Sequence, residues 1–247
     1  MAKYLALLYG LISYLVFFIT FLYAIGFVGN ILVPKSIDSG EPQTLASAII
    51  TNLILLSIFA IQHSVMARPA FKQWWTKFIP SSIERSTYVL LSSLALVIMY
   101  IYWIPMTDIV WEAKSAVAQN ILWAIFWLGW FIVLLSTFLI NHFDLFGLRQ
   151  VYLNLKNIDY THPPFTKRFL YKLVRHPIML GFIIGFWAIP TMTTGHLLFA
   201  VVTTIYILVA LQIEERDLVR FHGEEYRKYQ KAVGMIIPIP KIKSTDE

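Results

Sequence analysis

The densest group of reactive side chains in this sequence lies at residues 141–150, NHFDLFGLRQ, directly after a long apolar run. Five polar residues interrupt this aromatic stretch: Asn141, His142, Asp144, Arg149 and Gln150. Histidine and aspartate exchange protons, and the amide and guanidinium groups bind polar atoms. We expect a functional site here, because these residues exceed what a helix end requires. The alternative is a helix end with a glycine turn and an arginine reaching the membrane interface.

A second group, Arg175, His176 and Pro177, stands immediately before the apolar run 178–213. Proline fits the first turn of a helix, because its missing N–H group would have no intrahelical partner there. The N-terminus of such a helix, together with Arg175, would attract a carboxylate. A helix start with an interfacial arginine is the structural alternative.

A third group, Glu214 and Glu215, closes the same apolar run. Adjacent residues on a helix point about 100° apart, so both carboxylates cannot face the same way. Carboxylates near a helix C-terminus are mildly unfavourable. We therefore expect at least one of them to face inward and to bind a partner.

His63 and Arg68, in the motif QHSVMARP, could complete a pocket with these groups. A hydrogen-bonded packing histidine is an equally good reading of His63. The histidines form no HxxxH or HExxH pattern, so their spacing does not support a metal or haem site. The sequence also has no cysteine, which excludes thiolate nucleophiles and thiolate metal ligands.

The elements that must position these side chains are membrane helices. Of 247 residues, 58% are apolar and 14% are charged, whereas a soluble domain carries about 25% charged residues. A spanning helix needs about 20 mainly apolar residues. Four runs meet this requirement: residues 4–33, 45–66, 86–104 and 118–140.

The apolar run 178–213 is broken in its middle by Pro190 and the stretch TMTTG at residues 191–195. This pattern predicts a helical hairpin with a short first arm and a longer second arm over 196–213. Gly181 and Gly185 would let helices approach closely. The predicted fold class is all-α: a polytopic membrane protein with four spans and a C-terminal membrane hairpin, six apolar helices in total.

Basic residues predict the orientation of the chain. Of the 20 lysines and arginines, 18 fall on one predicted face, leaving Lys35 and Lys114 opposite. The positive-inside rule then places both termini in the cytoplasm, together with all the long polar segments. We therefore expect an integral membrane protein, with lipid as its surroundings and no nucleic-acid partner.

Two motifs carry a resemblance to a known superfamily. RHPIMLG at 175–181, followed by EE at 214–215 and FHGEEYRKY at 221–229, resembles the cofactor signature of the isoprenylcysteine carboxyl methyltransferases. These are integral membrane enzymes that use S-adenosylmethionine. In addition, HSVMARPAFK at 63–72 and STFLINHFDLFGLRQVYL at 136–153 resemble the NnrU-like branch, and within it the methanethiol S-methyltransferases that make dimethyl sulfide.

The resemblance implies one membrane methyltransferase domain over 1–247, with four spans in 1–140 and the cofactor site in 141–247. It also implies cofactor-binding roles for eight residues: Arg175, His176, Pro177, Gly181, Glu214, Glu215, Tyr226 and Tyr229. Arg175 or the hairpin's N-terminus suits the cofactor's carboxylate. Glu214 or Glu215 suits its ammonium group or ribose hydroxyls, His176 suits an adenine or ribose edge, and Tyr226 or Tyr229 could pack on the adenine.

Transfer of a methyl group to a small thiol needs a thiolate, in-line geometry and a dry site. A free thiol has a pKa of about 8.5 or above, so a base or a cationic neighbour is needed at neutral pH. We expect His142 as the base, Asp144 to orient or replace it, and His63 as the reserve. Asn141, Arg149 and Gln150 are predicted to bind the substrate.

One departure from the superfamily pattern bears on the acceptor: Met179 stands where prenylcysteine enzymes have tyrosine. The preferred function is methylation of a small volatile thiol. The alternatives are methylation of another lipophilic acceptor, and a nonenzymatic NnrU-type sensor or accessory protein holding haem through His63 or His142. The sequence leaves the oligomeric state undetermined.

Overall fold

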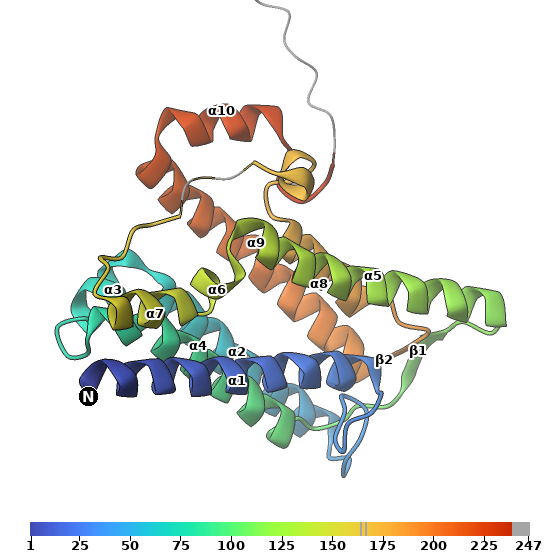
Figure 1. Cartoon of the computed structure of the whole chain (residues 1–247). Helices are drawn as coiled ribbons and strands as arrows, with labels where there is room; N and C mark the ends of the chain where they lie inside the picture. The colour runs from blue at the N-terminus through green and yellow to red at the C-terminus, as the bar shows by residue number, and fades with distance from the viewer. Residues whose placement is uncertain (164, 166, 239–247) are drawn as a thin grey trace, which may run out of the picture. The chain divides into compact units, whose positions relative to one another are not determined.

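The computed structural model describes residues 1–163, 165 and 167–238, and these are mostly helical (Figure 1). Five helices among them are long and apolar enough to cross a membrane: α1 (Ala2–Gly29), α2 (Leu45–Ala67), α4 (Ser81–Tyr102), α5 (Ala116–Ile140) and α9 (Thr194–His222). The first four coincide with the four predicted spans, and no end differs by more than five residues. The protein is therefore an integral membrane protein, as its composition predicts.

By its internal contacts the chain divides into two units. Unit 1 comprises Met1–Glu112, Asn141–Pro163 and Thr191–Phe199, and unit 2 comprises Ala113–Ile140, Pro164–Pro190 and Ala200–Glu247. The sections of the two units alternate along the chain, so they do not follow the predicted division at residue 140. A single methyltransferase domain stays a prediction, and each unit is described by itself.

In unit 1, α4 packs against both α1 and α2. Hydroxyl groups bridge these helices: the Tyr9 hydroxyl donates to Thr87 Oγ1 at 3.1 Å. The opposite face of α1 carries Leu8 and Leu15, seven residues apart and about half exposed. Apolar side chains on the outside of such helices are suited to contact lipid, because the backbone polar groups are already paired within the helix.

Three short helices complete unit 1: α3 (Pro69–Trp75), α6 (His142–Leu145) and α7 (Leu148–Lys156). Gly147 joins α6 to α7 with a φ of 87°. A Cβ atom at this position would lie 2.7 Å from the Ser86 backbone nitrogen. The turn therefore requires glycine, both for its backbone conformation and for its close approach to α4.

The chain is mostly helical, as predicted, but unit 1 also contains two short strands that were not predicted from the sequence. β1 (Ile109–Glu112) and β2 (Thr191–Thr193) pair antiparallel, with Ile109 opposite Thr193. The stretch 191–195, predicted as the break of the hairpin, thus supplies β2 and the start of α9. The backbone N–H groups of this stretch find carbonyl partners in a distant segment.

In unit 2, α5 packs closely against α8 (Pro177–Trp187). A Cβ atom added to Gly129 would lie 2.6 Å from the Gly185 nitrogen, and one added to Gly181 would lie 2.7 Å from the Gly129 carbonyl oxygen. Small residues at this crossing let the two backbones touch. The structure thus gives Gly181 and Gly185 the packing role expected of a membrane helix contact.

The predicted helical hairpin is formed by α8 and the part of α9 that belongs to unit 2. His176, which precedes α8, contacts Glu215 of α9, and Trp187 at the other end donates to Thr204 of α9 at 2.9 Å. The two arms therefore run antiparallel. With 11 residues, α8 is about 16 Å long and covers only part of a bilayer core of about 30 Å.

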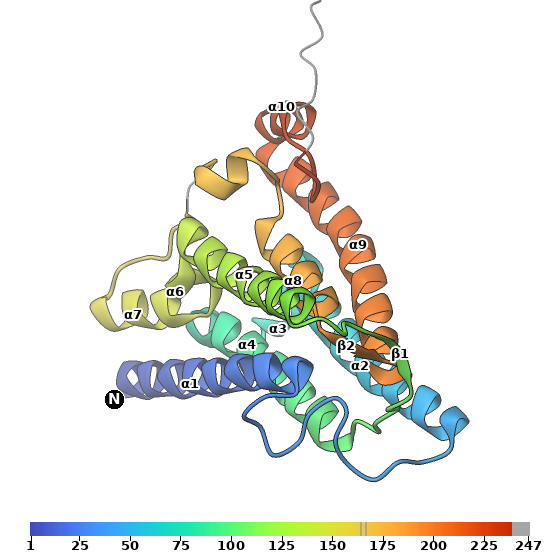
Figure 2. The same ribbon diagram turned by 90° about the vertical axis from the view of Figure 1, so that its right-hand side faces the viewer.

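The rest of unit 2 is the 3-10 helix η1 (Phe169–Lys172) and α10 (Glu224–Ala232), both near the start of the hairpin (Figure 2). After α10 the chain returns to the residues before α8. The Arg175 backbone N–H donates to the Gly234 carbonyl at 2.9 Å, and the His176 N–H donates to the Met235 carbonyl at 3.0 Å. Lys241 and Lys243, two of the 18 basic residues assigned to one predicted face, lie outside the described residues.

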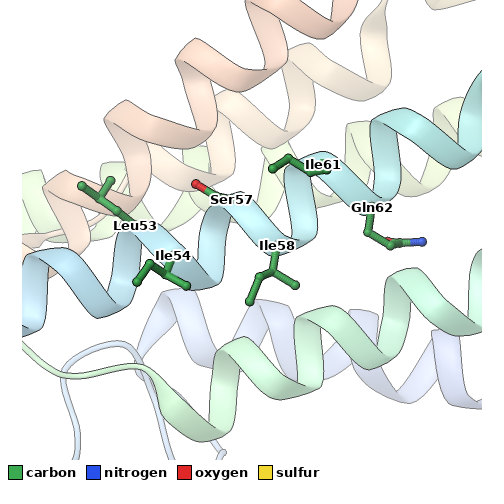
Figure 3. Close-up of a pocket in the computed structure, with 6 residues that line it drawn as sticks. All are labelled: Leu53, Ile54, Ser57, Ile58, Ile61 and Gln62. Carbon is green, nitrogen blue, oxygen red and sulfur yellow. The ribbon is translucent and has the colours of Figure 1, made fainter.

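A shallow groove of about 500 Å³ runs along α2 (Figure 3). All of its lining residues come from this one helix: Leu53, Ile54, Ser57, Ile58, Ile61 and Gln62. It contains no titratable side chain, and Ile58 and Ile61 are largely exposed. The groove is therefore a lipid-facing surface without a group that could transfer a proton.

Candidate active site

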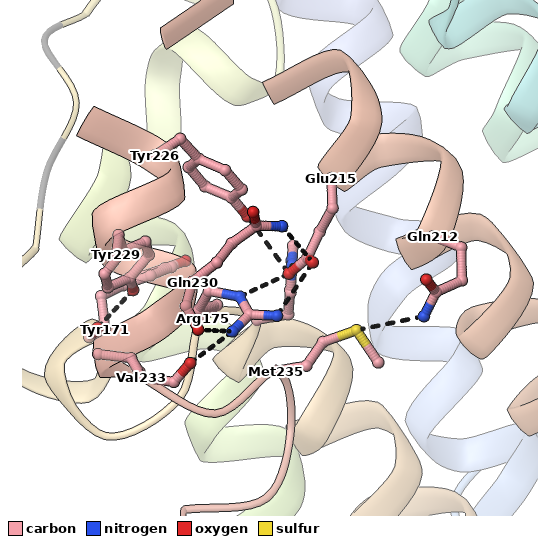
Figure 4. Close-up of polar contacts among 10 residues, drawn as sticks. Tyr171, Arg175, Gln212, Glu215, Tyr226, Tyr229, Gln230, Val233 and Met235 are labelled. Carbon is pink, nitrogen blue, oxygen red and sulfur yellow. Dashed lines mark hydrogen bonds and ion pairs between the residues drawn. The ribbon is translucent and has the colours of Figure 1, made fainter. Parts of the chain in front are cut away.

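Glu215 stands at the centre of a buried polar network in unit 2 (Figure 4). Its Oε1 atom accepts from Arg175 Nε at 2.6 Å and lies 3.0 Å from His176 Nε2. Its Oε2 atom accepts from Arg175 at 3.0 Å and from Gln230 Nε2 at 2.8 Å. Both carboxylate oxygens are thus saturated with donors, which is how a buried charge is stabilised.

Arg175 is held as completely as its partner. Two of its N–H groups bind Glu215 in a bidentate pair, and the remaining terminal nitrogen donates to the backbone carbonyls of Gln230 and Val233. Four of the five donors of a guanidinium group are therefore engaged within the chain. Arg175 clamps the end of α10 to the hairpin, so a cofactor carboxylate would have to displace these contacts to reach it.

His176 precedes Pro177, the first residue of α8, as expected from the RHP motif. Arg175, His176 and Glu215 are each buried, with less than 10% of the whole residue exposed. Glu214, next to Glu215, is half-buried and lies on another side of the helix. The prediction that one of the two carboxylates faces inward is confirmed, and the inward one is Glu215.

An aromatic group lies beside this network. Tyr226 and Tyr229 of α10 are both buried, and the ring of Phe165 lies 5.7 and 5.3 Å from theirs. The Tyr226 hydroxyl is 3.4 Å from Glu215 Oε1, and the Tyr229 hydroxyl donates to the Tyr171 carbonyl. Burial raises the pKa of Tyr229 to about 12 and raises that of Tyr226 as well. Both hydroxyls therefore remain protonated donors.

His142 lies in unit 1, as the first residue of α6. Its Nε2 atom is 2.8 Å from the hydroxyl of Tyr14 on α1, and Phe146 packs on its ring at 4.9 Å. Burial lowers the pKa of His142 below its usual value. The imidazole is therefore neutral at physiological pH and able to accept a proton. Asn141 caps α6, because its side-chain oxygen accepts from the Asp144 backbone N–H at 3.1 Å.

Asp144 is bonded to groups other than the His142 ring. Arg149 forms an ion pair with it at 3.0 Å, and the Tyr160 hydroxyl donates to its other oxygen at 3.1 Å. Arg149 also binds the carbonyl and the hydroxyl of Thr161, so it ties the segment after α7 back to α6. Gln150 donates weakly to Asp144, at 3.4 Å, while its buried Oε1 atom has no partner among the described residues.

His63 is surrounded by hydrogen-bonding and aromatic groups in unit 1. The hydroxyl of Tyr88 lies 2.8 Å from its Nε2 atom, Ser92 Oγ lies 3.2 Å from its Nδ1 atom, and Phe59 stacks on the ring. Tyr88 belongs to a hydrophobic cluster with Met66 and Val89, against which Phe146 also packs. The structure therefore brings His63 and His142 to the same apolar cluster without placing them in contact.

Sequence reasoning did not single out Tyr14, Gln230, Tyr160 or Phe165. Gln230 directly follows the FHGEEYRKY motif, so its position next to a motif tyrosine was a usable signal. Tyr14 stands alone in an apolar helix, where only a tertiary contact distinguishes it from a packing residue. Within the described residues, no group of three histidine, aspartate or glutamate side chains is arranged to hold a metal ion.

Comparison with known proteins identifies the family. A family model described as NnrU protein matches residues 52–232. The chain is 55% identical over 240 residues to a methanethiol S-methyltransferase of Mycobacterium tuberculosis, covering 97% of this chain and 98% of that protein.

Two further relatives agree with this match. Methanethiol S-methyltransferase 2 of Bradyrhizobium diazoefficiens is 54% identical over 96% of this chain and 91% of its own length. A methanethiol S-methyltransferase of Crocosphaera subtropica is 54% identical over 94% and 91%. No solved structure matches the chain. The chain thus belongs to the NnrU family, in the group of membrane proteins that includes these methanethiol S-methyltransferases.

Proposed function

We propose that this protein transfers a methyl group from S-adenosylmethionine to methanethiol and so produces dimethyl sulfide. The observation that carries the proposal is an identity of 50–55% over nearly the whole chain to six proteins named for methylation of methanethiol. Matches that cover 94–97% of this chain include both the His142 region and the Glu215 network.

The side chains of the Glu215 network fit this methyl donor. When bound, S-adenosylmethionine supplies a methyl group on a cationic sulfur, next to an amino acid end and an adenosine. The half-buried Glu214 carboxylate suits an ammonium group or ribose hydroxyls, and the rings of Tyr226, Tyr229 and Phe165 suit an adenine or a cation. His176 lies at the same point and suits an adenine or ribose edge.

Arg175 serves this site in a different way from the one expected. Because its guanidinium is bound to Glu215 and to two backbone carbonyls, we assign it the positioning of Glu215 and α10. Pro177 starts α8 and Gly181 lets α8 approach α5, so both support the site through the backbone.

On the acceptor side, His142 takes the thiol proton. A neutral imidazole is the form that accepts, and burial keeps His142 in that form near neutral pH. General base catalysis of this kind contributes about 10²- to 10⁴-fold. Asp144 holds Arg149 and Tyr160 in place beside α6, which positions the residues that follow His142.

The decisive experiment measures S-adenosylhomocysteine and dimethyl sulfide formed by the purified protein from S-adenosylmethionine and methanethiol. Stoichiometric formation of both products is expected. A prenylcysteine analogue serves as the competing acceptor, and an absorption spectrum tests for haem. Turnover of the analogue alone, or a haem band without turnover, would replace this function with one of the two alternatives.

The orientation of the chain belongs to the same proposal: both termini cytoplasmic, in the bacterial inner membrane. Since the sequence has no cysteine, single cysteines can report it without background. An impermeant maleimide should label Ser115→Cys in intact spheroplasts and Ser81→Cys only after permeabilisation. The reverse pattern would invert the orientation derived from the basic residues.

A further inference from the structure

The hydroxyl of Tyr14 occupies the ring nitrogen of His142 that faces α1. Its oxygen lies 2.8 Å from Nε2, and the two rings meet edge to face with centroids 5.7 Å apart. In the tautomer whose Nε2 is unprotonated, the hydroxyl donates to this nitrogen, and a thiol cannot reach the nitrogen's lone pair without displacing the hydroxyl. The Tyr14 hydroxyl therefore lies on the path that a proton must take from a substrate to His142 Nε2.

The Tyr14 hydroxyl also has capacity to spare. Within the described part of the chain, its only hydrogen-bond partner is His142 Nε2. A phenol that donates one hydrogen bond can still accept another at its oxygen. Tyr14 is only partly buried, so its side chain is not enclosed by the protein on every side.

Packing alone does not account for the hydroxyl. The Tyr14 ring is already held by Phe18, which stacks on it with an angle of 12° between the planes, and by Phe17 and Phe146 at centroid distances of 6.1 and 6.3 Å. A phenylalanine would make the same ring contacts. The hydroxyl adds only the link to His142.

We propose that Tyr14 is a further catalytic residue, whose hydroxyl relays the thiol proton to His142; this inference rests on the proposed function. The thiol S–H bond breaks and its proton passes to Tyr14 Oη. At the same time the original phenolic proton passes to His142 Nε2. The sulfur keeps the electron pair of the S–H bond and uses it to bond the donor's methyl group. The bond between that methyl group and the donor's sulfonium sulfur breaks, and its electron pair leaves with S-adenosylhomocysteine. Tyr14 ends neutral, and His142 ends as an imidazolium that returns its proton to water.

Other charged and titratable groups surround α6, and a comparison of pH profiles requires that wild type and variant share all of them. Arg85 of α4 donates to the Leu145 carbonyl at 2.8 Å. Arg149 of α7 is paired with Asp144, and Tyr160 donates to the same carboxylate. The test therefore changes the Tyr14 hydroxyl alone.

The test variant is Tyr14→Phe, and Tyr9→Phe is the matched control, because its hydroxyl on the same helix binds Thr87 instead. At pH 7 we expect Tyr14→Phe to lower turnover of methanethiol by about 10- to 10²-fold, with unchanged affinity for S-adenosylmethionine. The deficit should shrink toward pH 9, because more substrate then arrives as thiolate. Tyr9→Phe should behave as wild type at both pH values.

A second readout does not depend on turnover. A hydroxyl that donates to the neutral imidazole stabilises the neutral form, so its removal should raise the pKa of His142 in a histidine NMR titration. An equal loss of turnover at pH 7 and pH 9 with an unchanged His142 titration would reduce Tyr14 to a structural residue. Normal turnover in Tyr14→Phe would show that His142 receives the proton without it.

If the wild-type protein makes no S-adenosylhomocysteine, the proposed function fails, and the titration alone then decides whether Tyr14 donates to His142.

Discussion

The Glu215 network of unit 2 and the His142 region of unit 1 differ in how their buried polar groups are stabilised. In the network, the bonds to Glu215 join residues up to 40 positions apart, and a full negative charge is matched by a full positive one. The His142 ring makes contacts of another kind: it meets the phenol of Tyr14 and the aromatic side chains of Phe143 and Phe146.

This difference makes the Glu215 network suited to a rigid binding site and the His142 region suited to a chemical step. A buried ion pair with saturated hydrogen bonds resists titration and holds α8, α9 and α10 together, which suits the binding of a large charged molecule. A buried histidine that is neutral at physiological pH can accept a proton there, which suits a proton transfer. Substitutions in the two regions should therefore separate binding and stability from turnover.

The largest effect is expected for Glu215→Ala. Removing one partner of a buried ion pair leaves Arg175 unpaired, which costs about 3–5 kcal/mol of stability. We expect a lower unfolding temperature and no measurable binding of S-adenosylmethionine by calorimetry. Glu214→Ala is the matched control, and it should keep the stability and weaken binding only moderately. Equal behaviour of the two variants would remove the distinction between the inward and the outward carboxylate.

His142→Ala should show the converse pattern. Turnover of methanethiol at pH 7 should fall by about 10²- to 10⁴-fold, while affinity for S-adenosylmethionine stays near that of wild type. Raising the pH should restore part of the activity. Steady-state kinetics and calorimetry on the same preparation make the comparison. Retained turnover in folded His142→Ala would move the proton acceptor to His63 or Asp144.

The pH dependence of the wild type should reflect the same histidine. Burial lowers the pKa of His142, so the neutral, accepting form persists below the usual value of about 6.5. Turnover should therefore stay constant until the pH is below about 6.5. It should then fall by about tenfold per pH unit as the His142 ring becomes protonated. A profile of kcat/KM at saturating cofactor measures it. A decline that begins above pH 7 would contradict a buried, neutral base.

The smallest effect is expected for Asp144→Asn. If Asp144 only positions Arg149 and Tyr160, the substitution turns charge-assisted hydrogen bonds into ordinary ones, a difference of about 1–1.5 kcal/mol, and lowers turnover by roughly tenfold or less. Arg149→Gln should then show a loss of similar size, because it breaks the same ion pair from the other side. A loss for Asp144→Asn as large as that for His142→Ala would give the carboxylate a direct part in the chemistry.

Much of the architecture could be read from the chain because membrane spans are local features. The length and composition of an apolar run of about 20 residues are enough to predict a membrane helix. Four spans and the interrupted hairpin could therefore be predicted from residue order. The motif residues Arg175, His176 and Glu214–Glu215 followed in the same way, since their order and spacing around the apolar run carry the resemblance.

Contacts between distant segments were decided only in the folded chain. The pairing of β1 with β2 joins residues about 80 positions apart, and the bond between Tyr14 and His142 joins residues 128 apart. Residue order alone also could not tell whether Glu214 or Glu215 faces inward, because that depends on how α9 is rotated about its axis. Residue order could not predict the partner of Arg175 for the same reason. A guanidinium binds the carboxylate that the packing of three helices brings near it, and no local sequence pattern determines how close the two groups come.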